Sequence, residues 1–275
     1  MIQYKNIFNN PNMICIAQGG MYYVYEHQED LSVSPANANM SYFMKKMNVR
    51  KRQVLIALNE SAVKIQAGAM QWMSGAVKAD SGVTGVGNFL GKMARGIATG
   101  ESASKPRYSG TGYVMLEPTY HFLLVEDLST WEGGMVLDDG LFLACDADTR
   151  ETIVRRKNVA TAVLGGEGIF NLCLQGKGHA VLESPVPREE IFEFELQDDV
   201  LKIDGNMAIA WSATLNFSVE RVTKSLMGSA VAKEGFVNTY RGTGRVLMAP
   251  TLTGTLQSGR NSPEDTANPE SSLVH

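Results

Sequence analysis

The chain has 275 residues, of which 44% are hydrophobic and 20% are charged, and 27 of them are glycine. This composition disfavours a disordered protein and suits packed strands joined by tight turns. The net charge of -4 gives no reason to expect nucleic acid as a partner of the whole surface. The sequence shows neither a signal peptide nor a transmembrane run, so we expect a cytoplasmic protein.

The cysteines are few and far apart. Cys15, Cys145 and Cys173 are an odd number at wide spacing. This pattern is typical of reduced thiols and disfavours both a disulfide framework and a CxxC metal site.

The first 45 residues form an extension with two strand-like runs, 13–17 and 21–25, which we expect to add an edge to the main β assembly. A basic cluster follows Tyr42, Phe43 and Met44 and consists of Lys45, Lys46, Arg50, Lys51 and Arg52. Such a composition suits anionic lipid or RNA. The acidic total charge instead favours a solvated edge or linker, and that is our prediction for this cluster.

A helix is predicted over residues 81–99. Its apolar residues recur at helical spacing and are Phe89, Leu90, Met93, Ala94 and Ile97. Asn88 can cap the start of this helix, and Gly100 can end it. The glycine-rich run 85–91 could offer N–H groups to a phosphate, but it lacks the βαβ context of a nucleotide loop. We therefore interpret it as a flexible entry to the helix.

A glycine pair recurs along the second half of the chain. Its members are Gly110 and Gly112, Gly176 and Gly178, and Gly242 and Gly244. The interval from the first pair to the second equals the interval from the second to the third, and we call it the repeat interval. A constant interval between such glycine pairs predicts tandem structural repeats. The glycines are expected to let the backbone turn, bulge or approach a neighbour closely.

The repeat interval predicts three β units over residues 46–118, 119–185 and 186–250, with the helix 81–99 inserted in the first. Residues 1–45 precede the units, and the polar segment 251–275 is predicted to be a disordered tail. Alternating apolar residues over 170–175 predict strands within a unit. Asp139-Gly140 and Asp204-Gly205 predict tight turns, and Pro118 and Pro250 are expected to end strands.

One glutamate also recurs in each unit, as Glu101, Glu167 and Glu234. A threefold set of carboxylates could serve as ligands or acids at a crevice. Alternatively, each carboxylate satisfies backbone N–H groups in a turn of the same shape. Repetition favours this structural role, and we keep the three glutamates and the six glycines as structural or ligand-crevice candidates.

No residue pattern points to a reaction centre. The histidines are His27, His121, His179 and His275, and none forms a His-x-His pair. The position after each glycine pair holds Tyr113, His179 or Arg245, so it is neither a recurring metal ligand nor uniformly basic. A nucleophile elbow is also absent from the sequence. We predict no catalytic residue, no cofactor, no metal and no nucleic-acid partner.

Several motifs together resemble a known family. They are Ala69–Gly75, Gly100–Ser102, Asp139–Ala144, Gly166–Phe170 and Lys233–Val237. Their order and spacing over residues 46–250 resemble the bacterial relatives of the altered-inheritance-of-mitochondria protein twenty-four family. Mitochondrial members are linked to organisation of the inner membrane, and bacterial members have no settled biochemical activity. The family brings no catalytic residues to this sequence.

The resemblance implies an all-β fold of three tandem short double-stranded β-helix units, similar to the tryptophan RNA-binding attenuation protein (TRAP-like), and a homotrimer. Our leading hypothesis is a non-enzymatic oligomeric scaffold or interaction module. An unknown protein partner and peripheral membrane contact stay open. The alternative is a small-molecule binding protein with ligand sites between units or subunits. An enzyme, metal-free or metal-dependent, is the third and least favoured hypothesis.

Overall fold

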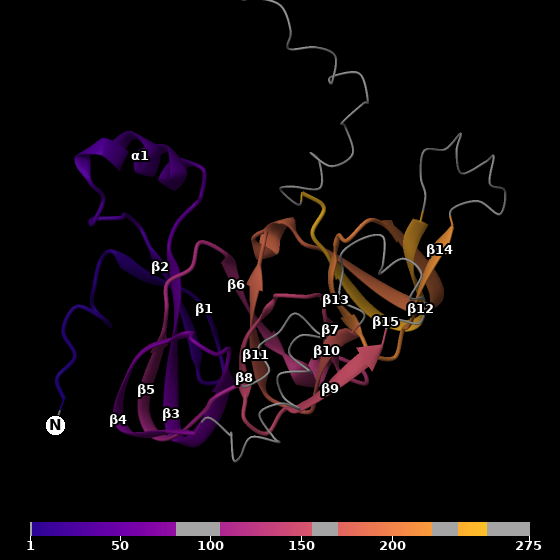
Figure 1. Ribbon diagram of the computed structural model, residues 1–275, viewed down its shortest axis with the longest axis horizontal. Helices are drawn as coiled ribbons and strands as arrows, with labels where there is room; N and C mark the ends of the chain where they lie inside the picture. The colour runs from indigo at the N-terminus through magenta and orange to yellow at the C-terminus, as the bar shows by residue number, and fades with distance from the viewer. Residues whose placement is uncertain (1, 81–104, 156–169, 222–235, 252–275) are drawn as a thin grey trace, which may run out of the picture.

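The structure is a computed structural model and describes residues 2–80, 105–155, 170–221 and 236–251 (Figure 1). Several sequence predictions lie outside the described residues. These are the helix over 81–99 with its glycine-rich entry, Glu101, Glu167, Glu234, and the tail from residue 252.

The described chain is predominantly β, and all of its strand pairings are antiparallel. An eight-stranded sheet contains β1 (Met13–Gly19), β2 (Tyr22–His27), β3 (Arg52–Ile65), β4 (Met70–Asp80), β5 (Arg107–Leu116), β6 (Phe122–Asp127), β8 (Phe142–Asp146) and β11 (His179–Ser184). A seven-stranded sheet contains β7 (Met135–Leu137), β9 (Arg150–Arg155), β10 (Phe170–Gln175), β12 (Phe192–Asp204), β13 (Ala208–Ser212), β14 (Asn216–Arg221) and β15 (Phe236–Met248). The expectation of a β-rich chain is confirmed.

Helical structure is sparse in the described residues. One α-helix, α1, spans Ala38–Lys46, and three short 3₁₀ turns are η1 (Pro35–Asn37), η2 (Leu128–Thr130) and η3 (Arg188–Glu190). In Figure 1, α1 lies at the top of the molecule, beyond the ends of the strands of the first sheet. α1 was not predicted from the sequence, although Met40, Phe43 and Met47 follow helical spacing.

The two strands predicted in the N-terminal extension are confirmed as β1 and β2. They form a hairpin, and β2 pairs along β3 from Tyr22↔Ile56 to Glu26↔Arg52. Gly20 has a φ of +52° at the turn between them, a conformation that glycine adopts without steric cost. The extension therefore widens the first sheet beside β3.

The middle of the chain contributes to both sheets. Strands β6, β8 and β11 belong to the first sheet, whereas β7, β9 and β10 belong to the second. Figure 1 shows these strands between the outer parts of the two sheets. Residues 119–185 therefore join the two sheets and are not a separate layer.

Turn predictions are also confirmed. Gly140 lies between β7 and β8 with a φ of +79°, and Gly205 lies between β12 and β13 with a φ of +62°. Pro118 and Pro250 follow the ends of β5 and β15, where the missing N–H of proline costs no sheet bond.

Apolar side chains fill the interior of both curled sheets. Val54, Ile56 and Val63 of β3 are fully buried in the first sheet. In the second sheet, Trp211 and Tyr240 pack edge to face with ring centres 5.5 Å apart. Each fully buried apolar side chain stabilises the fold by roughly 1.5–3 kcal/mol. The core therefore forms without disulfides.

Candidate functional site

The six recurring glycines all have a positive φ. Their φ values are +128° at Gly110, +149° at Gly112, +124° at Gly176, +100° at Gly178, +117° at Gly242 and +153° at Gly244. A side chain on Gly112 would place its Cβ 2.0 Å from the backbone oxygen of Ser74. The expected close approach is confirmed there, whereas Gly176 has open space and needs glycine only for its φ.

Two of the glycine pairs sit opposite a β-bulge of the same construction. The pairing of β3 with β5 shifts register between Leu58 and Ser61, and the pairing of β12 with β15 shifts between Leu196 and Asp199. Each bulge contains one residue of positive φ. A bulge of this kind bends a strand and increases its twist.

A threonine between the two glycines holds each bulge. The Glu60 N–H donates to Thr111 Oγ1 at 3.1 Å, and the Asp198 N–H donates to Thr243 Oγ1 at 3.0 Å. Glu60 and Asp198 are the residues of positive φ, at +49° and +52°. The hydroxyl therefore satisfies a backbone donor that the bulge removes from the ladder.

The position after each glycine pair is covered by a different segment of the chain. The ring of Tyr113 contacts Tyr4 and Phe8, with ring centres 5.2 and 5.4 Å away. His179 lies against the β1–β2 turn, because a Cβ on Gly20 would be 2.7 Å from its Nδ1 atom. Tyr113 and His179 are therefore partly covered by the N-terminal extension.

At the third pair, the guanidinium of Arg245 lies over the Trp131 ring, 4.0 Å from its centre. Arg245 also donates to Thr130 Oγ1 at 3.0 Å and to Glu193 Oε1 at 2.9 Å. Trp131 and Thr130 belong to the η2 region, so here too a connecting segment covers the position.

A polar residue on the neighbouring strand anchors each of these contacts. Ser74 Oγ and the Tyr4 hydroxyl are 2.8 Å apart, and the Ser212 hydroxyl accepts the Arg245 N–H at 2.9 Å. The third residue of this set is Asp146, and its partners lie far from it in sequence.

Asp146 receives two donors. Its Oδ1 accepts the Tyr22 hydroxyl at 2.9 Å, and its Oδ2 accepts the His179 N–H at 3.3 Å. Tyr22 is fully buried. Burial first, and then the Asp146 charge, raise the pKa of Tyr22, so the phenol stays a protonated donor.

A buried carboxylate lies where the two sheets meet. Glu126 of β6 accepts Trp131 Nε1 at 3.4 Å and Arg188 Nη1 at 3.2 Å. Burial raises the pKa of Glu126, and the nearby Arg188 and Arg245 charges oppose that rise. Glu193 bonds to both arginines at 2.9 Å. This network ties the first sheet to β12 and β15 of the second.

A shallow pocket of about 240 Å³ opens beside this network. It is lined by Thr130, Glu132, Glu195, Leu196, Gln197, Ser212, Thr243, Gly244 and Arg245. One of the candidate glycines, Gly244, therefore borders a crevice in the described structure.

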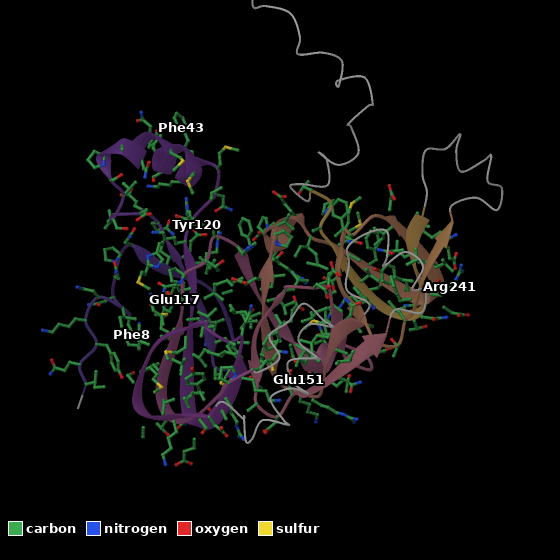
Figure 2. All side chains as sticks on the ribbon, in the orientation of Figure 1. Phe8, Phe43, Glu117, Tyr120, Glu151 and Arg241 are labelled. Atoms are coloured by element: carbon green, nitrogen blue, oxygen red, sulfur yellow. The ribbon has the colours of Figure 1, made fainter. Side chains whose placement is uncertain are left out.

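Lys45, Arg50 and Lys51 of the basic cluster line a larger pocket, of about 320 Å³, between α1 and the first sheet, together with Glu29 and Asp30. Asn12, His27, Gln53 and Tyr120 line it as well. Figure 2 shows Tyr120 below α1, on which Phe43 is labelled.

The prediction of a solvated basic edge is confirmed for the exposed Lys46 but is wrong for Arg52. The ion pairs are Lys45–Glu29, Arg50–Glu26 at 2.7 Å, Lys51–Asp30 at 2.8 Å and Arg52–Glu26 at 2.7 Å. Arg52 is only 1% exposed. The acids come from the end of β2 and the turn after it, so the clue was the acidic run shortly before the cluster in sequence. A charge buried to this extent requires such a partner.

The described thiols and carboxylates do not gather into a metal centre. In these ranges there is no group of three or more His, Cys, Asp or Glu side chains that could hold a metal ion. Cys145 and Cys173 are buried, and burial raises the pKa of both thiols, to about 12 for Cys145. Both therefore stay protonated near neutral pH. Within the described residues, none of the helices has the length and apolar character to cross a membrane.

The comparisons with known proteins agree with the residues that first suggested a family. Residues 44–251 match the family described as mitochondrial biogenesis AIM24. A crystal structure of a Streptococcus pyogenes protein is similar in fold, with a TM-score of 0.55 and 24% identity over 77% of this chain and 93% of that one. No curated protein matches the chain. The family match covers most of the sequence, and the chain belongs to the mitochondrial biogenesis AIM24 family.

Proposed function

We propose that the protein is a non-enzymatic oligomeric scaffold, built from three TRAP-like β units per chain and assembled as a homotrimer. The observation that carries the proposal is a strand pairing that recurs three times. Leu116, Leu182 and Met248 follow one another at the repeat interval, and each lies in a strand that pairs across a one-residue irregularity. The irregularities lie at Met70–Trp72, Phe142–Ala144 and Ala208–Ala210.

Repeated units favour a scaffold because each copy offers the same surface again. A unit as short as the repeat interval buries its strand faces poorly alone, and stacking against neighbours completes the core. In a multimer the same surfaces then recur around the assembly and can bind a partner with avidity.

The polar groups at the glycine pairs support a non-enzymatic role. Asp146 is engaged by Tyr22 and His179, and Glu126 by Trp131 and Arg188. These groups satisfy one another across strands, whereas a reaction centre directs a nucleophile, a base and a charge-stabilising donor toward one open point. The free cysteines suit a reducing compartment, so we place the scaffold in the cytoplasm.

The test is the mass of the purified protein by gel filtration with light scattering at micromolar concentration. We expect about three times the chain mass of 30.0 kDa. A monodisperse monomer would contradict the assembly and, with it, the scaffold.

The pocket beneath α1 favours a second candidate, a small-molecule binding protein. It is large enough for a small organic ligand, and an anionic one would compete with Glu26 and Asp30 for Arg50 and Lys51 on its wall. Calorimetric titration with a short dicarboxylate checks this candidate. Binding by the wild type and by Lys46→Gln, with loss in Arg50→Gln, would support it. No heat in any of the three would exclude this ligand class.

A further inference from the structure

Two joints between successive units have the same register. In the first, β3 pairs with β8 through Val63↔Asp146, Lys64↔Cys145 and Ile65↔Ala144. In the second, β7 pairs with β13 through Met135↔Ser212, Val136↔Trp211 and Leu137↔Ala210. On their other side, Val63 and Met135 pair with Tyr108 and Leu174, which are separated by the repeat interval. Val63 and Met135 therefore hold equivalent positions.

The next equivalent position falls on β12. Leu201 pairs with Tyr240, which follows Leu174 at the repeat interval, so Leu201 corresponds to Val63 and Met135. Among the described strands, β12 pairs only with β15. No strand of the described residues forms a third joint beside Leu201.

The first two joints each join a strand to β8 or β13, and the strand equivalent to β8 and β13 at the start of the chain is β4. Cys145 pairs with Ala180 and Trp211 with Val246, and Met73 pairs with Val114, which precedes Ala180 by the repeat interval. Met73 thus corresponds to Cys145 and Trp211. Within the described sheets, β4 pairs only with β5, and its other edge faces no strand.

Burial at these positions follows the presence or absence of a joint. Cys145 is 0% exposed and Trp211 is 4% exposed, but Met73 is 43% exposed. Val63 and Met135 are fully buried, whereas Leu201 is only partly buried. At the edges of β4 and β12 that face no described strand, apolar positions are therefore exposed or partly exposed, whereas a neighbouring strand covers the equivalent positions at the two internal joints. Exposed apolar edges of this kind favour edge-to-edge pairing.

We infer that β12 of one copy pairs with β4 of a second copy in the register of the two internal joints. The pairs are Leu201↔Ser74, Lys202↔Met73 and Ile203↔Trp72, with the second residue of each on the second copy. This contact rests on the repeated-unit scaffold proposed above and names the surface through which it assembles. It joins two different edges, so successive copies follow head to tail, and three copies joined in this way at every edge form a closed ring.

Disulfide trapping tests the register. In a background with the exposed Cys15→Ser, the double variant Met73→Cys/Lys202→Cys is oxidised and run on a denaturing gel without reductant. We expect covalent oligomers from the double variant and monomers from each single variant. The matched control Met73→Cys/Asp204→Cys moves one thiol two positions along the same strand and should cross-link far less.

Cross-linking tests the register of the β12–β4 contact, and light scattering tests whether the chain forms an oligomer at all. If light scattering shows oligomers but the double variant does not cross-link, or the control cross-links more strongly, the proposed register is wrong and the oligomer remains. A monomeric wild type would overturn both.

Complementation tests whether two different edges meet. Met73→Glu blocks the β4 edge and Leu201→Glu blocks the β12 edge, because a charge would be buried in the joint. Each variant alone should be monomeric, and an equal mixture should form a heterodimer through the two intact edges. Rescue in the mixture also shows that both variants fold. If circular dichroism shows both variants folded and the mixture stays monomeric, the edges do not meet.

Discussion

The glycine pairs of β5 and β15 differ from the pair between β10 and β11 in what surrounds them. In β5 and β15 the strand runs through the pair and stays in one sheet, whereas β10 and β11 lie in different sheets. A Cβ on Gly110 or Gly112 would meet backbone oxygen at 2.1 or 2.0 Å, but one on Gly176 would meet nothing within 4 Å. Glycine pairs of positive φ thus occur both opposite a bulge within a sheet and at a crossing between sheets.

Alanine substitutions should separate the glycines by what surrounds them. Gly112→Ala adds a backbone clash to an unfavourable φ and should lose about 3 kcal/mol or more of unfolding free energy. Gly176→Ala bears only the φ cost, about 1–2 kcal/mol. Gly178→Ala should fall between them, because its nearest neighbour is the Asp146 carboxylate. Urea denaturation followed by circular dichroism measures all three, and equal losses would contradict the distinction.

The second change targets the anchor beside the middle glycine pair. Tyr22→Phe removes a buried donor from the Asp146 carboxylate and should lose about 1.5–3 kcal/mol. Tyr4→Phe is the matched control, because its bond to Ser74 is between neutral groups and should contribute about 1 kcal/mol or less. Thermal melts of both variants check the order. A larger loss in Tyr4→Phe would show that the Asp146 anchor is not the stronger one.

Much of this arrangement follows from short-range sequence patterns, and the rest depends on distant residues. The glycine pairs, the turns at Gly140 and Gly205 and the strands of the extension are local, because backbone conformation at glycine and strand alternation are read from neighbours. The division of residues 119–185 between two sheets is not local. It depends on which strand edges meet, and the identical Gly-x-Gly spacing carries no sign of it.

The candidate site shows the same limit. Tyr22 and Asp146 are 124 residues apart, and nothing near either residue signals the bond. The pairing of the basic cluster was missed because composition was weighed over the whole chain, where the excess is acidic, and not against the acids at the end of β2. The three recurring glutamates lie outside the described residues, so their role stays a prediction.

The threonines sharpen the likeness between the first and third glycine pairs. Thr111→Val and Thr243→Val each remove the acceptor of a bulge N–H at a solvent-exposed site. We expect each to lose about 0.5–1 kcal/mol, by nearly the same amount. Lys177→Val, at the corresponding place of the second pair, is the control and should change stability little. Urea denaturation of the three variants measures this, and a clear difference between the two threonine variants would argue against a shared construction.

Glu126, near the third glycine pair, should make a small contribution to the pH dependence of stability. The folded pKa of Glu126 is raised above its unfolded value, so the folded state binds the proton more readily. Stability from this group therefore rises as pH falls through the folded pKa and is lost as pH rises above it. Glu126→Gln should remove this slope between neutral and mildly acidic pH. Melting temperatures of wild type and variant across that range check it, and an unchanged slope would assign the effect to another group.

The attachment of α1 has a consequence for how the chain opens. No residue of α1 is buried, and ion pairs from Lys45, Arg50 and Lys51 hold the segment around it to the end of β2 and the turn after it. Dissolved salt weakens ion pairs between partly exposed side chains, but it leaves apolar burial largely intact. Amide hydrogen exchange should therefore speed up with added salt over residues 35–47 while the sheet amides keep their protection. One chain thus contains two kinds of stability, and ionic strength acts mainly on one of them.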